Sequence, residues 1–520
     1  MINKLDMSAQ HPFGMKYYAV LARAWVYWPL LLLSAALVPF AFAPYYHYWL
    51  LPVLLAVLLI LQTARPQWRV RSAYLWALTA YTALLYWIDI ALHDIAGLPQ
   101  FLAWPLTMLL PAYLAIYPAL VFWLLGKFRF SSTTCHTVVL PLLWTLAEFV
   151  RERALTGFGW GIWGYSQIAD SALAGFAPVG GIFLVTLVTV ASGAWLAELL
   201  LAKKRKAKIG CGVSLISVWL LGAVLLQCNF TQADGTHATV ALAQGNIPQS
   251  LKWDERSLQP TLQRYLDQIA STRASIVILP ETAIPVMRQD MAPEQLDIFA
   301  HLARKHGSAL AVGIPQYTAD GTGYLNAVVN FTATPSEAGL PYYAKDHLVP
   351  FGEYIPLPLL LDWLYRWMDM PLTGFSKGGS AQAPLQLANQ RVAFNICYED
   401  GFGDELIATA KQASLLANVS NMAWYGHSHA MQQHLQQSQA RALETGRYIV
   451  RATNTGMTAI INPKGQIVAQ LKPDTAAVLE GEISGYRGNT PYMWLGSSWP
   501  LTFISLFLLL IIGVYGRYRH

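Results

Sequence analysis

The stretch Phe394-Asn-Ile-Cys397-Tyr-Glu-Asp400 decides the fold class of this chain. It begins as an apolar run suited to a buried strand and reaches a cysteine, which polar and turn-forming residues follow. Catalytic groups in α/β folds converge at the ends of strands. The stretch therefore predicts an α/β domain in which Cys397 lies at a functional edge of a sheet.

Two other stretches have the same form. Ile278-Leu-Pro-Glu281 ends an apolar run at a carboxylate, and Tyr342-Tyr-Ala-Lys345 ends one at an ammonium group. A cysteine, a carboxylate and an ammonium together suffice for acyl transfer, because the thiol needs a base and the tetrahedral oxyanion needs a positive donor. A nearby ammonium also favours the thiolate. We therefore predict that Glu281, Lys345 and Cys397 form a catalytic triad.

Each of these residues has an ordinary structural explanation when it is taken alone. Glu281 could cap a helix, Lys345 could be a solvated loop cation, and Cys397 could be a small core residue. The joint pattern is far more specific than any of its parts. The remaining cysteines, at positions 135, 211 and 228, form no CxxC pair and have no metal-ligand spacing, so we expect neither a disulfide framework nor a metal site.

The residues around these stretches, from about 236 to 487, have the composition of a water-soluble α/β domain. Short β-branched runs predict strands at 239–242, 276–279, 392–394 and 457–461. Helices are predicted near 255–271, 293–306 and 428–447. Alternating strands and helices over this length predict one α/β domain with a substantial core.

The remainder of the chain is much more apolar. The 520 residues are 55% hydrophobic and only 12% charged, against about 25% charged in an ordinary soluble protein. A bilayer core about 30 Å thick requires about 20 mostly apolar residues per helix. We predict about eight membrane spans, at 24–43, 48–63, 73–93, 101–125, 136–152, 176–201, 209–228 and 497–515. The first span ends in Ala41-Phe-Ala43 like a signal-peptide cleavage site, but Pro44 follows at once and we expect a retained helix.

Basic residues between the spans predict their orientation. Clusters such as Lys203-Lys-Arg-Lys206 occupy alternate loops, whereas the connections at 44–47 and 94–100 contain no Lys or Arg. Basic loops face the cytoplasm, so both termini should be cytoplasmic and residues 229–496 should lie on the opposite side. The charge of +6 then reflects orientation in a bilayer, and we expect no nucleic-acid partner. The predicted domains are a transmembrane domain at 1–235, a catalytic domain at 236–487, and a final transmembrane helix with its tail at 488–520.

The order Glu281, Lys345, Cys397 resembles the nitrilase superfamily. The resemblance includes the contexts Pro-Glu-Thr, Lys-Asp-His-Leu-Val-Pro-Phe-Gly-Glu and Ile-Cys-Tyr-Glu-Asp. It implies an α-β-β-α sandwich in which Glu281 is the general base and Cys397 the nucleophile. It further implies that Lys345 stabilises the oxyanion together with the backbone N–H of Tyr398.

A narrower resemblance covers nearly the whole chain. The stretches Gly245-Asn-Ile-Pro-Gln-Ser-Leu-Lys-Trp253-Asp-Glu255, Leu155-Thr-Gly-Phe and Gly164-Tyr-Ser-Gln167, with the flanking spans, are similar to the apolipoprotein N-acyltransferase family. One departure is Met422, where the family more often has Asp. This resemblance implies a multi-pass protein of the bacterial cytoplasmic (inner) membrane, with its catalytic domain on the periplasmic side.

The narrower resemblance also implies supporting residues. Glu353 matches a glutamate that orients the lysine or assists catalysis, although a salt bridge at the rim of the site is the alternative. Tyr398 and Glu399 match positions that shape the pocket and hold the cysteine loop. Trp253 and Trp424 match substrate-binding positions, and the family residue that Trp253 matches is on a mobile loop near the entrance. A lone aromatic is more often ordinary packing.

The family resemblance implies that phosphatidylethanolamine or a similar phospholipid is the acyl donor and that a diacylglyceryl-cysteine at a lipoprotein N-terminus is the acceptor. It implies no metal or organic cofactor. One alternative is a membrane-tethered amidase or nitrilase that passes the acyl group to water. The other is a non-catalytic transporter or scaffold, which would not require the three residues together. The apolar stretch Leu359–Met368 could form a membrane-surface arm or pack in the core.

Overall fold

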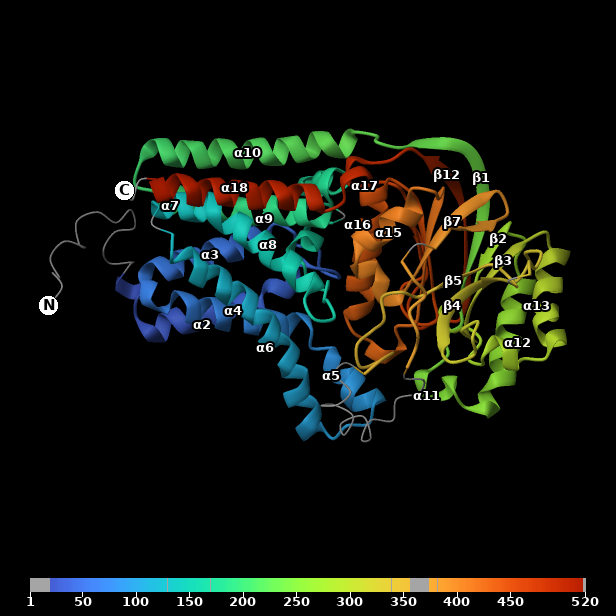
Figure 1. The fold of residues 1–520 in the computed structure, drawn as a ribbon. Helices are drawn as coiled ribbons and strands as arrows, with labels where there is room; N and C mark the ends of the chain where they lie inside the picture. Colours follow the sequence, from blue (N-terminus) through green and yellow to red (C-terminus); the bar gives the residue numbers. More distant parts are fainter. Residues whose placement is uncertain are drawn as a thin grey trace. The chain divides into compact units, whose positions relative to one another are not determined.

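The computed structural model describes residues 19–517 except 129, 169, 338, 356–373 and 381, with side chains as far as 507. The stretch Leu359–Met368 lies outside the described residues. The described chain forms two compact units (Figure 1). The first consists of the described parts of Met1–Tyr86, Pro105–Cys228 and Leu495–His520, and the second of Trp87–Trp104 and Asn229–Trp494. The predicted domain boundaries at 235/236 and 487/488 stay predictions.

The second unit contains a six-stranded sheet with the order β12-β1-β2-β3-β4-β5. Strands β1, β2 and β3 are parallel, and the remaining pairs are antiparallel. Their bounds are Gln232–Gln244 for β1, Ile276–Ile278 for β2, Ala309–Tyr317 for β3, Tyr324–Asn330 for β4, Tyr342–Ala344 for β5 and Ala477–Arg487 for β12. Helices connect the parallel strands, as parallel pairing requires.

A second six-stranded sheet has the order β11-β10-β9-β8-β7-β6. Strands β7, β8 and β9 are parallel, and the other pairs are antiparallel. Their bounds are Leu385–Leu387 for β6, Gln390–Ile396 for β7, Leu415–Ser420 for β8, Ile449–Thr453 for β9, Ala459–Ile461 for β10 and Ile467–Gln470 for β11. Every residue of β8 and β9 is buried, which is typical of parallel strands covered on both faces.

The core of the second unit lies between the two sheets. One buried cluster joins side chains of both, including Val240, Ile278, Phe394 and Val419. The helices α12 (Glu255–Ala270) and α13 (Pro293–Lys305) cover the outer face of the first sheet, and α15 (Gly403–Ala410) and α16 (Ala430–Thr445) cover that of the second (Figure 1). This arrangement confirms the predicted α-β-β-α sandwich.

Helix boundaries in this unit follow from local chemistry. The side chain of Asp254 accepts a hydrogen bond from the backbone N–H of Arg256 at 2.9 Å and caps the start of α12. Helix α16 ends at Gly446, whose φ of 62° lies in the left-handed region that glycine adopts without a steric penalty. The predicted helices at 255–271, 293–306 and 428–447 therefore end within a few residues of the observed ones.

The first unit is helical. Five of its helical segments are long and apolar enough to cross a membrane: Ala24–Ala41, Gln100–Leu125, Ser132–Arg153, Ala172–Leu201 and Arg205–Gln227. Each matches one of the predicted spans. The helices Leu50–Ala64 and Pro66–Leu84 meet the same criterion only as a pair, and they are bent by 118° where they join.

The described residues therefore contain five or six membrane-capable helices, not the eight predicted. The predicted span at 73–93 is wrong at its end, because α4 (Arg69–Leu84) stops at Leu84 and Trp87–Trp104 belong to the second unit. There the indole N–H of Trp87 donates to Oε1 of Gln433 at 3.2 Å, so the residue packs on α16. At the C-terminus α18 (Ser498–Arg517) lies at the last predicted span, and its described side chains, Ser498–Phe507, form an apolar stretch shorter than a membrane span.

One membrane-capable helix contains buried charges. Glu148 lies in α8 (Leu140–Arg153) and accepts hydrogen bonds from the backbone N–H of Trp163, at 3.1 and 3.2 Å, and from the hydroxyl of Thr186 at 3.1 Å. Arg151 donates to the carbonyl oxygen of Trp160 at 2.9 Å. These polar side chains are tolerated in an apolar unit because each is hydrogen-bonded to the segment that follows the helix.

Candidate active site

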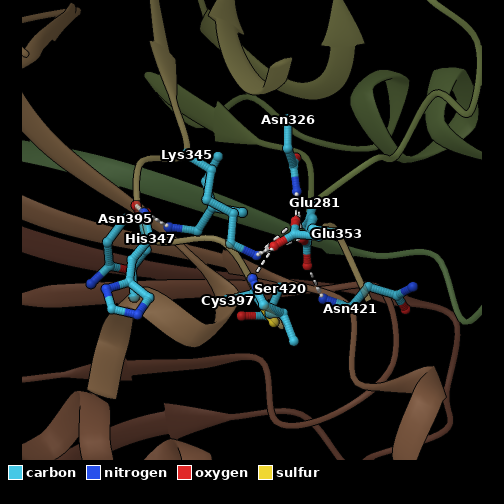
Figure 2. A network of polar contacts seen from close by, with 12 residues as sticks. Glu281, Asn326, Lys345, His347, Glu353, Asn395, Cys397, Ser420 and Asn421 are labelled. Carbon is cyan, nitrogen blue, oxygen red and sulfur yellow. Dashed lines mark hydrogen bonds and ion pairs between the residues drawn. The ribbon is translucent and has the colours of Figure 1, made fainter. Parts of the chain in front are cut away.

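The three predicted catalytic residues follow the ends of three strands. Glu281 comes three residues after β2, Lys345 directly after β5, and Cys397 directly after β7. Strands β2 and β5 belong to the first sheet and β7 to the second, so the site forms where the two sheets meet. Figure 2 shows the three side chains gathered in one cluster.

Two carboxylates surround the ammonium group of Lys345. Its Nζ atom lies 2.9 Å from Oε1 and 2.8 Å from Oε2 of Glu353, and 3.7 Å from Oε1 of Glu281. All three side chains are buried. Burial by itself disfavours a charged lysine, but the two carboxylates outweigh it and raise the pKa of Lys345. The lysine is therefore a permanent cation that is shielded from water.

Asn326 on β4 joins the two carboxylates. Its Nδ2 group donates to Oε1 of Glu281 at 2.8 Å and to Oε1 of Glu353 at 3.0 Å (Figure 2). Its main-chain oxygen accepts a hydrogen bond from the backbone N–H of Lys345 at 2.8 Å. Asn326 was missed by the sequence analysis, because it lies within the strand instead of after its end.

Two further hydrogen bonds, each involving a main-chain atom, fix the position of Glu281. Its Oε2 atom accepts a hydrogen bond from the backbone N–H of Asn421 at 2.8 Å, just beyond the end of β8. Lys252 donates from Nζ to the carbonyl oxygen of Glu281 at 3.2 Å. Lys252 closes the four-residue helix α11 (Gln249–Lys252) and is 5% exposed. Glu281 therefore has a fixed position before any substrate binds.

Lys252 is a second buried lysine close to the site. Burial lowers its pKa to about 8, against the opposing charge of Glu281. It lies next to Trp253 in the stretch Gly245–Glu255, but nothing in the sequence distinguishes its side chain. The apolar neighbours of a lysine in a short helix give no signal that the side chain turns inward.

The backbone of Cys397 is in the left-handed region, with a φ of 53°. A non-glycine residue in this region is strained and is held there only by its surroundings. Burial and the charge of Glu281 raise the pKa of the Cys397 thiol to about 12, whereas Lys345 lowers it by less. The sequence predicts that the ammonium favours a thiolate, but in the structure burial and Glu281 outweigh the ammonium. The resting residue is a neutral thiol that needs a base.

Glu399 joins the cysteine loop to the lysine loop. Its carboxylate accepts backbone hydrogen bonds from Ile396 at 2.7 Å, Asp346 at 2.7 Å and His347 at 3.1 Å, and another from the hydroxyl of Tyr343 at 2.9 Å. These contacts come from both sheets. The role of Glu399 that the sequence suggested, to hold the cysteine loop, is therefore supported by its geometry.

The predicted pocket residues differ in burial. Tyr398 is buried against Phe402, with ring centroids 5.1 Å apart. Trp253 and Trp424 are half-buried. Trp253 follows Lys252, and Trp424 lies on the short helix η9 (Ala423–Tyr425) that follows Asn421. Both indoles therefore belong to segments that contact Glu281.

The arrangement can activate a thiol and stabilise a negative oxygen without another group. Glu281 can accept the thiol proton, and the Lys345 ammonium can face the charge that develops on the substrate oxygen. Among the described residues no three His, Cys, Asp or Glu side chains are placed to hold a metal ion.

Comparison with known proteins places this geometry in a family. A carbon-nitrogen hydrolase model matches residues 239–492, and a model of the apolipoprotein N-acyltransferase N-terminal domain matches residues 34–195. An apolipoprotein N-acyltransferase of Neisseria meningitidis serogroup B is 57% identical, with 100% of both chains covered. One of Chromobacterium violaceum is 49% identical over 94% of this chain and 95% of its own. A solved carbon-nitrogen hydrolase from Helicobacter pylori has a TM-score of 0.35 at 15% identity, covering 48% of this chain and 89% of its own.

The sandwich fold and the family matches define a carbon-nitrogen hydrolase-type enzyme, joined in one chain to several helices that are long and apolar enough to span a membrane. Within this class the chain belongs to the apolipoprotein N-acyltransferase family. The acyltransferase activity and the nitrilase-like fold that the sequence implied are thereby confirmed.

Proposed function

We propose that this enzyme transfers a fatty acyl chain from a phospholipid to the N-terminal amino group of a diacylglyceryl-cysteine in an apolipoprotein, through a thioester on Cys397. The observation that carries the proposal is the buried Lys345 ammonium between Glu281 and Glu353, beside the one cysteine of the second unit. A permanent cation next to a base and a thiol matches the charges that acyl transfer creates.

The first half of the reaction makes the acyl-enzyme. Glu281 takes the proton of the Cys397 thiol as the sulfur bonds to the carbonyl carbon of the phospholipid ester. The carbonyl electron pair moves to the oxygen, and Lys345 and the backbone N–H of Tyr398 stabilise the oxyanion. When the oxyanion collapses, the bond to the glycerol oxygen breaks, and this oxygen takes the proton from Glu281. A lysophospholipid leaves, and the acyl chain stays on the sulfur.

The second half uses the same groups in reverse. The amino group of the acceptor attacks the thioester carbon, and the proton of the amine passes through Glu281 to the departing sulfur. Because donor and acceptor use one thiol in turn, the kinetics are ping-pong. A thiol with a pKa of about 12 supports this assignment, since attack on a phospholipid ester, a weak electrophile, then needs a base to remove the thiol proton.

The lipid substrates account for the apolar unit. Extracting an acyl chain from a bilayer costs about 0.8 kcal/mol per CH₂ group, so an enzyme embedded in the membrane avoids that cost. Phosphatidylethanolamine is the proposed donor, and the periplasmic side of the bacterial inner membrane is the proposed location of the catalytic unit. The basic loops of the first unit support this orientation.

The test uses the purified full-length enzyme in detergent micelles. Phosphatidylethanolamine with a labelled acyl chain is added without acceptor, and the protein is examined for a hydroxylamine-sensitive label on Cys397. We expect a stoichiometric thioester and one lysophospholipid per labelled enzyme, with Cys397→Ser as the unlabelled control. Continuous release of free fatty acid without acceptor would instead identify a membrane-bound hydrolase, and no label at all would reject the covalent mechanism.

A further inference from the structure

The carbonyl oxygen of Cys397 contacts a buried polar cluster behind the site. Nε2 of His434, on α16, lies 2.9 Å from this oxygen. Arg451 on β9 contacts the other ring nitrogen, with its Nη2 atom 2.6 Å from Nδ1 of His434. Nη1 of Arg451 lies 3.0 Å from Oδ2 of Asp400. The side chains of His434, Arg451 and Asp400 are all completely buried.

These contacts determine the position of the ring proton. An arginine guanidinium donates hydrogen bonds and never accepts them, so Nδ1 of His434 must be the acceptor. The proton therefore resides on Nε2, which donates to the Cys397 carbonyl. The opposite tautomer would place an N–H against Arg451 and a lone pair against the carbonyl oxygen, and both contacts would be repulsive. The sulfur of Met422 lies 3.1 Å from Nδ1, but it is too weak an acceptor to offset these two repulsions.

The neutral state of His434 is stable as well. Burial and the charges of Arg451 and Lys345 hold its pKa well below the ordinary value, against the hydrogen bond to Cys397. The charged and titratable groups that face the ring are Arg451 and Asp400, the latter 3.9 Å from Nε2. His434 therefore presents a fixed donor to the Cys397 carbonyl.

The same peptide group contains a second polar atom, the N–H of Tyr398. The carbonyl of Cys397 and the N–H of Tyr398 belong to one planar trans peptide, because the only cis bond among the described residues is Ala43–Pro44. In a trans peptide the C=O and N–H bonds point in opposite directions. A carbonyl held in the buried cluster therefore turns the Tyr398 N–H to the opposite side.

We infer that His434 is a positioning residue for oxyanion stabilisation. By binding the Cys397 carbonyl, it sets the orientation of the Cys397–Tyr398 peptide and polarises this peptide. The Tyr398 N–H then faces the position of the future oxyanion before acyl transfer begins. This inference rests on the proposed function. A hydrogen bond accepted by the carbonyl strengthens the N–H of the same peptide as a donor. A donor oriented in advance avoids reorganisation during the reaction. The hydrogen bond from the buried cluster also helps to hold the backbone of Cys397 in its strained conformation, with a φ of 53°.

The test compares two reactions of the same thiol. Acylation by phospholipid develops an oxyanion, whereas alkylation by iodoacetamide forms the S–C bond with departure of iodide and develops none. In the full-length His434→Leu variant we expect acylation to slow by at least about tenfold, since deleting one oxyanion donor outright costs about 10²–10³. Alkylation should stay within about twofold of wild type, because it does not use the Tyr398 N–H.

Two further variants separate positioning from stability. His434→Gln retains an amide donor near the position of Nε2 and an acceptor for Arg451, so it should recover most of the acylation rate. Gln439→Leu is the matched control, because Gln439 lies on the same helix and donates to the carbonyl oxygen of Gly465 at 2.8 Å, away from Cys397. This variant should lose stability without selective loss of acylation.

The outcomes distinguish the possible failures. If His434→Leu slows acylation and alkylation equally, or acylates as fast as wild type, His434 has no positioning role and the inference is overturned. If wild-type enzyme forms no thioester with phospholipid, the proposed function fails before His434 is tested. Selective loss of acylation in His434→Leu, with recovery in His434→Gln, supports the inference.

Discussion

Lys345 contacts both carboxylate oxygens of Glu353, at 2.9 and 2.8 Å. Its distance to the nearer oxygen of Glu281 is longer, 3.7 Å. Glu353 is therefore the main partner of the ammonium, which leaves Glu281 able to exchange a proton with the thiol. Because Lys345 is 1% exposed, the pair is buried, unlike a salt bridge at the rim of the site.

The Glu353→Gln substitution tests this division of roles. Breaking a buried ion pair costs about 3–5 kcal/mol, an upper bound here because Glu281 remains as a second carboxylate partner. We expect the lysine to move toward Glu281, which slows thioester formation by at least about tenfold through loss of transition-state stabilisation. Rates of acylation and thermal unfolding midpoints would be measured together. A variant as active as wild type would show that Glu281 alone holds the lysine.

The second prediction concerns the nucleophile. Cys397→Ala should abolish acyl transfer and leave the fold intact, because the substitution removes only the thiol, which acts as a nucleophile and not as a packing element. Cys397→Ser should also be nearly inactive, since a hydroxyl is a much weaker nucleophile than a thiol. The measurements are acyl transfer to a synthetic lipopeptide and size-exclusion chromatography in detergent. Near-normal transfer by either variant would exclude a thioester.

The third prediction separates the two effects of Glu281 on the thiol. Its charge raises the pKa of Cys397, so the Glu281→Gln substitution should lower that pKa and increase the thiolate fraction. Alkylation by iodoacetamide at pH 8 should then become faster. Acyl transfer should fall by about 10²–10⁴, because the general base is lost. Opposite changes in the two rates are expected, and a parallel decrease would argue against Glu281 as the base.

The fourth prediction concerns Lys252 and pH. Its pKa is about 8 in the folded enzyme against 10.5 for an exposed lysine. Between pH 8 and 10.5 Lys252 is protonated in the unfolded chain and neutral in the folded chain, so its contribution makes the free energy of unfolding rise with pH. Below pH 8 the folded chain bears the full cost of burying the charged lysine. The shift corresponds to a penalty on the order of 3 kcal/mol.

Replacing Lys252 with Met should remove this dependence. At pH 7 the Lys252→Met variant should unfold at a higher temperature than wild type, and the difference should shrink as the pH approaches 10. The unfolding midpoints of both proteins, measured in the same detergent from pH 7 to 10, provide the comparison. Parallel curves would mean that Lys252 titrates normally.

The fifth prediction concerns orientation in the membrane. The basic loops predict that the catalytic unit faces away from the cytoplasm while the C-terminus faces it. Compartment-sensitive reporters inserted at position 350 and fused after His520 should therefore report opposite sides. If both reporters give the same side, the proposed orientation is wrong.

Local patterns in the sequence determined an α/β domain joined to apolar helices, and the order of the reactive residues. Apolar runs that end at Glu281, Lys345 and Cys397 are visible without any tertiary information, because strand burial and the chemistry at strand ends are both local. The long apolar helices are equally local, since the thickness of a bilayer sets their length. These signals were sufficient to predict an α/β domain and five of the membrane-capable helices, whereas the sandwich was predicted from the family resemblance.

Only the tertiary structure decided how the charges of the site are paired. The Asn326 bridge between Glu281 and Glu353 joins β4 to two loops, and the inward turn of Lys252 brings a distant segment to Glu281. The raised pKa of Cys397 depends on burial, which a list of neighbouring residue types does not reveal.

The unit to which Trp87–Trp104 belong was likewise decided by contacts between distant residues. In sequence, the start of this segment continues an apolar run and resembles the end of a membrane span. In the structure, Trp87 instead packs on Tyr425, with ring centroids 4.7 Å apart, and donates to Gln433. Hydropathy alone cannot distinguish burial in lipid from burial against protein, because both environments remove the same apolar surface from water.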